Sequence, residues 1–267
     1  MQGKVAIVAG GGRDIGRACA LELAKNGANV VITYHSSSAT ALSAVAEIKR
    51  LGQQAVAVQA DLTSQSDVDK TVAAALDTFG SIDTLVHVSG GLVGRVRIDD
   101  MSLEHYNTVM NLNMTSLFMM TRACIPHLKS GSSIVTFASQ AGRDGGGPGA
   151  AIYATSKGAV MTYTRALAKE LGPDIRVNSV CPGMISTGFH DTFTQDTVRK
   201  NVAGATALKR EGTSEEVAKV VYFLASKESS FVTRRCSPIN GLVNDSKNTN
   251  LEFGYSSTLS LLMLWLR

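Results

Sequence analysis

Short apolar runs alternate with helical patterns along most of this chain, and this alternation restricts its fold more than any other feature. The runs that predict strands lie near residues 4–9, 29–34, 55–59, 84–88, 133–138 and 175–180. Helical patterns follow them near 15–26, 39–51, 65–78, 102–129, 151–171 and 214–226. Because the runs are apolar on both faces, they are typical of a parallel sheet with helices on each side. We therefore predict a doubly wound α/β fold.

Composition fits a single domain and excludes several functions. The 267 residues carry a net charge of +4 without a dense basic run apart from Arg234 and Arg235, so we expect no nucleic-acid partner. No stretch approaches the ~18–20 apolar residues of a membrane span. The chain opens on a predicted strand rather than a signal peptide, and its cysteines lack metal-ligand spacing. These features favour a cytoplasmic protein with reduced thiols and no metal site.

The last residues follow a different pattern. Residues 244–250 are polar and 259–266 apolar. We predict a catalytic domain over 1–243 and an atypical C-terminal tail over 244–267. Whether the tail docks on the body, docks on another subunit or is poorly ordered stays open.

A glycine-rich turn connects the first predicted strand to the first predicted helix. Gly10 would permit a tight turn and Gly16 a close approach of helix and sheet, so that free N–H groups face a dinucleotide pyrophosphate. A plain strand–helix turn is the alternative. Asp14 stands where glycine would suit a bound phosphate, and we expect its carboxylate to cap the helix, offset by Arg13 or Arg17. The predicted cofactor contacts here are Gly10, Arg13, Asp14, Ile15 and Gly16.

Tyr153 and Lys157 are four residues apart in a predicted helix, so their side chains share one face, with Cβ atoms about 5–6 Å apart. A free phenol has a pKa near ~10 and is a poor proton donor at neutral pH. A neighbouring ammonium group favours the phenolate and lowers that pKa. The pair is therefore a candidate general acid and base. The alternative is an aromatic ring covered by a lysine stem.

The glycine turn, Asn113, Ser139, Tyr153 and Lys157 occur in the order of the short-chain dehydrogenase/reductase family, which the chain resembles over roughly residues 3–241. The resemblance implies a Rossmann-type fold and hydride transfer between a nicotinamide cofactor and a carbonyl group or secondary alcohol. Ser139 would bind the substrate oxygen, Tyr153 would exchange the proton, and Lys157 would lower the tyrosine pKa. Asn113 would hold a water that links Lys157 to solvent.

The same resemblance assigns further cofactor contacts. They are Asp61 and Leu62 at the adenine, Gly90 beneath the cofactor, the pair Pro182 and Gly183, Thr187 at the carboxamide, and again Tyr153 and Lys157.

The end of the second predicted strand bears on the choice between NAD and NADP. NAD-binding sites normally carry an acidic side chain there, but Tyr34-His35-Ser36-Ser37 contains none. Arg13 could instead pair with a 2′-phosphate, helped by a serine hydroxyl group. We favour NADP(H), with NAD(H) as the alternative, and place Tyr34 and Ser36 in the site.

Two segments depart from the family pattern. His87-Val88-Ser89-Gly90 replaces the common Asn-Asn-Ala-Gly, and His87 is either a structural side chain or a titrating switch. From Arg234 onward, two arginines and Pro238 replace small or strand-forming residues, although proline cannot donate in a central strand. In the family this region often lines the substrate pocket or a subunit interface. Because the region is altered here, the sequence defines neither the pocket nor the interface.

The substrate is less well defined. Segments 142–151 and 184–207 should border the pocket, and the second resembles the family's mobile lid. The chain most resembles 3-oxoacyl-acyl-carrier-protein (β-ketoacyl) reductases, yet of two basic carrier contacts only Lys129 is present. A small ketone, sugar or polyol is an equal alternative. A cofactor-binding protein with a sensing or scaffold role is the competing class of function.

Family membership would also imply a homo-oligomer. Such proteins are usually tetramers or dimers, joined by a bundle of their two longest helices, here near 102–129 and 151–171.

Overall fold

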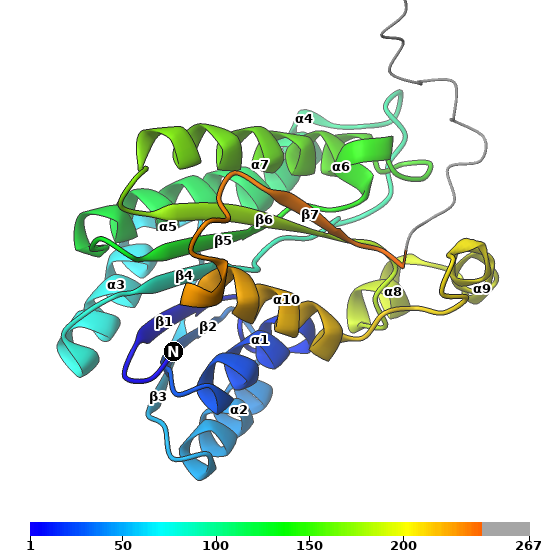
Figure 1. Ribbon diagram of the computed structural model, residues 1–267. Helices are drawn as coiled ribbons and strands as arrows, with labels where there is room; N and C mark the ends of the chain where they lie inside the picture. Colours follow the sequence, from blue (N-terminus) through cyan, green and yellow to red (C-terminus); the bar gives the residue numbers. More distant parts are fainter. Residues whose placement is uncertain (242–267) are drawn as a thin grey trace, which may run out of the picture.

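The computed structural model describes residues 1–241 and contains one seven-stranded parallel sheet, with the strand order β3-β2-β1-β4-β5-β6-β7 (Figure 1). The strands are β1 Val5–Ala9, β2 Asn29–Tyr34, β3 Ala55–Gln59, β4 Thr84–His87, β5 Ser133–Phe137, β6 Arg176–Pro182 and β7 Cys236–Ile239. All six predicted strands are present, and the predicted doubly wound fold is confirmed. The strand order reverses between β1 and β4, which is where such sheets bind ligands.

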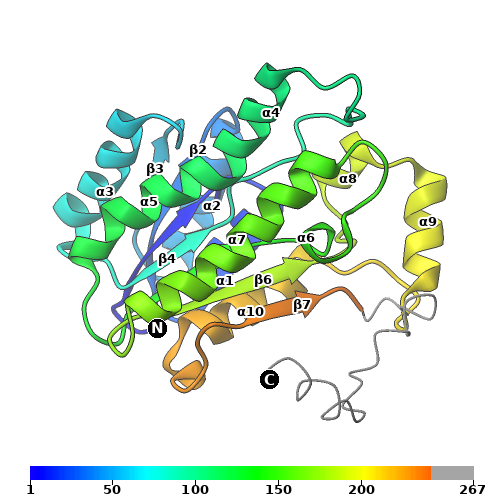
Figure 2. The same ribbon diagram turned by 90° about the horizontal axis from the view of Figure 1, so that it is seen from above.

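Helices cover both faces of the sheet. The long ones are α1 Asp14–Lys25, α2 Ser38–Arg50, α3 Gln65–Phe79, α7 Ala151–Glu170 and α10 Ser214–Ala225. Buried side chains of α1, α2 and α10 pack on one face, and those of α3, α5 (Ser116–Cys124) and α7 pack on the other (Figures 1 and 2). Because the central strands β1, β2 and β4 are enclosed from both sides, most of their residues are apolar without alternation.

The helix predicted over 102–129 is not continuous. It consists of α4 (Leu103–Met110), a π-helical turn at Asn111–Thr115, and α5, followed by a 3₁₀ turn at Ile125–His127. Apolar periodicity does not register the extra residue of a π-turn, which explains the single predicted helix. The π-turn is the element that carries Asn113.

A seventh strand forms where the sequence departs from the family pattern. β7 pairs with β6 in parallel, with Pro238 opposite Cys181. Within residues 1–241, β7 is one of the two edge strands of the sheet. The missing N–H of Pro238 therefore removes no hydrogen bond between central strands. The boundary at 243 remains a prediction, and the tail from 244 lies outside the described residues.

Short helices lie beyond the carboxyl ends of the strands. They are α6 Ala141–Asp144, α8 Gly188–Phe193 and α9 Asp196–Ala205, which fall in the segments predicted to border the pocket (Figure 2). None of the helices in residues 1–241 has the length and apolar character needed to cross a bilayer.

Candidate active site

Tyr153 and Lys157 occupy the first two turns of α7, at the carboxyl edge of the sheet. The Lys157 side chain is buried, and its Nζ donates a hydrogen bond of 2.9 Å to the carbonyl oxygen of Phe137 at the end of β5. Nζ also lies 5.8 Å from the centre of the Tyr153 ring. The structure thus brings the predicted pair together and fixes the lysine to the sheet.

Burial dominates the electrostatics of this pair. It lowers the pKa of Lys157 to about 8 and raises the pKa of Tyr153, while a hydrogen bond with Ser139 acts to lower the tyrosine value. The Lys157 ammonium is directed at Phe137, and it is not among the causes that shift the pKa of Tyr153. That Lys157 lowers the tyrosine pKa stays a prediction.

Ser139 follows β5 and faces the same site. Its Oγ accepts a hydrogen bond of 3.2 Å from the N–H of Ala141, at the start of α6. This contact holds Oγ beside the phenol of Tyr153, to which the serine hydroxyl donates the hydrogen bond that acts to lower the tyrosine pKa.

Asn113 is buried in the π-turn and bonds to backbone. Its Oδ1 accepts from Gly91 N–H at 3.0 Å, and its Nδ2 donates to the carbonyls of Gly91 (2.8 Å) and Val109 (2.9 Å). The side chain thereby joins α4 to the loop after β4. The water relay expected of Asn113 stays a prediction, since these contacts occupy most of its hydrogen-bonding capacity.

Gly90 sits between the two polar residues of the site. A Cβ at this position would lie 2.6 Å from Oδ1 of Asn113 and 2.8 Å from Nζ of Lys157, so only glycine fits. His87, at the end of β4, is buried near Lys157, and both effects lower its pKa to about 3. It stays neutral in the physiological range, which favours the structural role over the switch.

The glycine turn has the predicted close contacts. Gly10 adopts φ 84°, and a Cβ there would lie 2.7 Å from Ser89 Oγ. A Cβ at Gly16 would collide with the carbonyl oxygen of Gly10. The glycines therefore let the backbone of the turn pack closely before the N-terminus of α1, as a dinucleotide phosphate requires.

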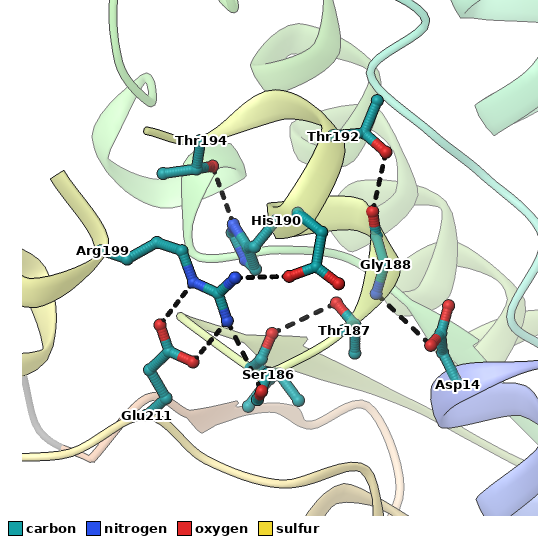
Figure 3. Close-up of polar contacts among 11 residues, drawn as sticks. Asp14, Ser186, Thr187, Gly188, His190, Thr192, Thr194, Arg199 and Glu211 are labelled. Atoms are coloured by element: carbon teal, nitrogen blue, oxygen red, sulfur yellow. Dashed lines mark hydrogen bonds and ion pairs between the residues drawn. The ribbon is translucent and has the colours of Figure 1, made fainter. Parts of the chain in front are cut away.

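Asp14 does not cap α1, contrary to the expectation from sequence. Arg13 is the N-cap residue, no side chain bonds the free N–H groups of the first turn, and Asp14 itself has φ 46°. With that backbone its carboxylate turns away from α1 and accepts a hydrogen bond from Gly188 N–H at 3.4 Å (Figure 3). Arg17 pairs with Glu47 instead of Asp14.

The predicted adenosine end lies beside this turn. A Cβ on Gly12 would lie 2.8 Å from Ser37 Oγ and 3.0 Å from Cβ of Tyr34, so the end of β2 borders the glycine turn. The side chain of Arg13 is mainly exposed and 3.8 Å from Asp14. Asp61 accepts hydrogen bonds from the N–H and hydroxyl of Thr63, and these lower its pKa. Ser36 is exposed and Leu62 is buried.

The remaining predicted contacts follow β6. Pro182 ends that strand, and Gly183 is so close to β7 that a Cβ would lie 2.7 Å from Cβ of Asn240. Thr187 precedes α8 and donates from Oγ1 to the carbonyl of Ile185 at 3.1 Å. The altered C-terminal segment therefore supports this wall of the site through β7.

Helix α8 covers Tyr153. The Phe189 ring centre lies 6.0 Å from that of Tyr153 and 5.2 Å from that of Phe193. An ion-pair clamp holds this segment: Arg199 of α9 bonds Asp191 and, at 2.7 Å through two nitrogens, Glu211 (Figure 3). Sequence reasoning missed Arg199, because its partners lie eight residues before it and twelve residues after it, and such spacings give no local signal.

Comparison with known proteins agrees with this geometry. Residues 9–241 match the family model described as Enoyl-(Acyl carrier protein) reductase. A hydroxynaphthalene reductase-like protein of Metarhizium guizhouense is 35% identical over 90% of this chain and 95% of its own length. A short chain dehydrogenase/reductase of Aspergillus aculeatus is also 35% identical, over 90% and 96%. The chain belongs to the short-chain dehydrogenase/reductase family.

Solved structures of this family have the same fold. A short chain dehydrogenase of Burkholderia cenocepacia in complex with NADP gives a TM-score of 0.85 at 33% identity, over 91% of this chain and 98% of its own. An NADH-dependent reductase responsible for alginate metabolism gives 0.82 at 31% identity, over 90% and 96%. Relatives of comparable similarity thus include one in complex with NADP and one that is NADH-dependent.

Proposed function

We propose that this protein is an NADP(H)-preferring carbonyl reductase or alcohol dehydrogenase. The proposal rests on the buried Lys157. Its Nζ is hydrogen-bonded to the Phe137 carbonyl and lies close to the Tyr153 ring and to Gly90. Burying an amine this deeply costs stability, and such groups concentrate at functional sites.

The glycine turn fits a dinucleotide. Gly10, Ile15 and Gly16 would hold the pyrophosphate at the start of α1, and Gly90 and Thr187 would border the nicotinamide end. When bound, the cofactor supplies or accepts the hydride. Ser139 donates a hydrogen bond to the substrate oxygen, where negative charge grows during reduction. Tyr153 gives that oxygen its proton, and Lys157 stabilises the phenolate that remains.

The cofactor preference rests on the end of β2. No carboxylate follows Tyr34 to repel a 2′-phosphate, and Arg13 is exposed at the neighbouring turn. We expect a kcat/KM at least tenfold higher with NADPH than with NADH. Equal efficiency with the two cofactors would contradict this preference.

For the substrate we propose a ketone with an aromatic or other flat apolar face. Phe189 and Phe193 provide an apolar surface next to Tyr153, and the Metarhizium relative is named a hydroxynaphthalene reductase-like protein. A carrier-bound 3-oxoacyl group is the second candidate, supported by the description of the family model and by Lys129.

Oxidation of NADPH by a panel of aromatic, aliphatic, sugar and acyl-thioester ketones tests this proposal. We expect turnover of aromatic ketones and a loss of at least about 10³-fold in kcat for Tyr153→Phe, which removes the proton donor. Tyr163→Phe, on the same helix but bonded to Thr121, is the matched control. Cofactor binding without turnover of any ketone would favour the sensing or scaffold role.

A further inference from the structure

Arg95 joins three segments that border the candidate active site. It lies in the loop between β4 and α4, and its Nε donates to the carbonyl oxygen of Phe193, the last residue of α8, at 3.0 Å. Its Nη1 donates to the carbonyl oxygen of Pro148, also at 3.0 Å. Pro148 belongs to the segment 145–150, which connects α6 to α7. One side chain therefore links residues that are 98 and 53 positions away from it in sequence.

The backbone fixes one half of this junction without the arginine side chain. The N–H of Val96 donates to the carbonyl oxygen of Gly149 at 3.1 Å. Gly149 has a φ of 73°, and a Cβ there would lie 3.0 Å from both Cβ of Arg95 and N of Val96, so this position requires glycine. The loop after β4 is thus held on segment 145–150 by main-chain contacts, and the guanidinium group of Arg95 adds the link to α8.

Arginine has the right geometry for such a link. Its planar guanidinium group holds five N–H donors in fixed directions, whereas the ammonium group of lysine is a compact point charge. Within residues 1–241 no carboxylate pairs with Arg95, and its acceptors are the two carbonyl oxygens. Arg97, two residues later, pairs instead with Asp99 of its own loop.

Both segments that Arg95 connects lead to Tyr153. In α8, Phe189 covers the phenol with 6.0 Å between ring centres, and Phe193 packs on Phe189 at 5.2 Å. Segment 145–150 runs directly into α7, where Tyr153 is the third residue. The spacing between α8 and segment 145–150 therefore sets the space beside Tyr153 in which the two substituents of a ketone must fit.

We propose that Arg95 is a positioning residue that determines which face of a prochiral ketone is reduced, because it fixes α8 relative to segment 145–150. The inference rests on the proposed function and deepens it. Ser139 and Tyr153 would hold only the substrate oxygen, so a ketone has two orientations that exchange its large and small substituents. Hydride addition in these two orientations gives opposite enantiomers of the alcohol. A space of fixed width accepts the large substituent on one side only.

Reduction of 2-acetylnaphthalene with NADPH, followed by chiral chromatography of the alcohol, tests this role. The naphthyl and methyl groups differ greatly in size, so the enantiomer ratio reports the orientation of the bound ketone. We expect the wild type to produce an excess of one enantiomer and Arg95→Gln to lower the ratio about tenfold. The KM for the ketone should rise about three- to tenfold, while kcat and the KM for NADPH change less than about twofold.

Two further variants separate the bridge from the charge. Arg95→Lys keeps the charge but contacts one carbonyl oxygen at a time, so it should resemble Arg95→Gln. Arg97→Gln removes the same charge from the same loop and should keep the wild-type ratio. Thermal melting checks that every variant is folded.

Several results would overturn this role of Arg95. A wild-type enantiomer ratio in Arg95→Gln, or a racemic product from the wild type, would refute it and leave the proposed function intact. Full rescue by Arg95→Lys, or an equal change in Arg97→Gln, would assign the effect to charge and refute the bridge. If the wild type reduces no ketone, the proposed function fails and this inference fails with it.

Discussion

At the scale of single residues, Lys157 is placed where it opposes stability. It is 4% exposed, and burial lowers its pKa to about 8, whereas a free lysine has a pKa near ~10.4. Between these two values the unfolded chain binds more protons than the folded one, so stability rises with pH across this window. Below about pH 8 both forms are protonated, and the full cost of burial remains.

We therefore expect Lys157→Met to raise the free energy of unfolding at pH 7 by about 1–3 kcal/mol while abolishing reduction. The gain should shrink as the pH rises from 8 to 10.5. Urea unfolding at several pH values measures it, with Lys169→Met, exposed on the same helix, as the control. A gain that does not change with pH would contradict this account of Lys157.

Arg234 has a strained backbone conformation. Its φ is 65°, in the left-handed region, and its N–H donates to the Val177 carbonyl at 2.8 Å. Arg234→Gly keeps this bond and relieves the backbone, for a gain of about 0.5–1 kcal/mol, or roughly 1–4 °C in Tm. Arg235→Gly, where φ is not positive, should lower Tm in the same calorimetric scan. A lower Tm for Arg234→Gly would show that its side chain matters more than its backbone.

At the scale of elements, the ion pairs of Arg199 tie α9 to α8, the helix that covers Tyr153. Arg199 alone bridges Asp191 before α9 and Glu211 after it. Arg199→Gln should leave the fold intact, raise the KM for the ketone about three- to tenfold through loss of substrate positioning, and speed proteolysis within 186–205. Arg210→Gln breaks an exposed ion pair with Glu216 and is the matched control. Equal effects of the two substitutions would contradict a specific role for Arg199.

The helices and strands also show how much of the fold the local sequence pattern predicts. Apolar runs and helical periods placed all the strands up to β6, because each element is buried by its own residues. The π-turn at Asn111–Thr115 was missed, since one extra residue per turn changes hydrogen bonding without changing which residues are apolar. Pro238 makes strand β7 uncertain from sequence alone, because the proline is tolerated only if no further strand pairs with β7 on its outer side.

At the scale of the whole molecule, parallel topology made most of the candidate site predictable. Ser139, Gly90 and Gly183 follow different strands, but the carboxyl ends of parallel strands meet at one edge, so their proximity follows from the fold. The bond from Asp14 to Gly188 could not be inferred in this way. It joins the first residues of two helices at long sequence separation and depends on a backbone conformation that the sequence does not indicate.

The assembly is the last property that belongs to the molecule as a whole. We propose a homo-oligomer formed through the face of α4, α5 and α7, where Leu103 is 73% and Phe118 is 43% exposed. Large apolar side chains exposed on helices of one face are typical of subunit interfaces.

Phe118→Glu should then lower the native mass, measured by light scattering, from that of a tetramer or dimer toward 28.1 kDa. The mass would fall because the carboxylate introduced at position 118 would be desolvated at the subunit interface. Leu42→Glu changes a residue that is 58% exposed on α2, across the sheet, and should leave the mass unchanged. A monomeric wild-type protein would refute the proposal. A smaller mass for Leu42→Glu alone would move the interface to the other face of the sheet.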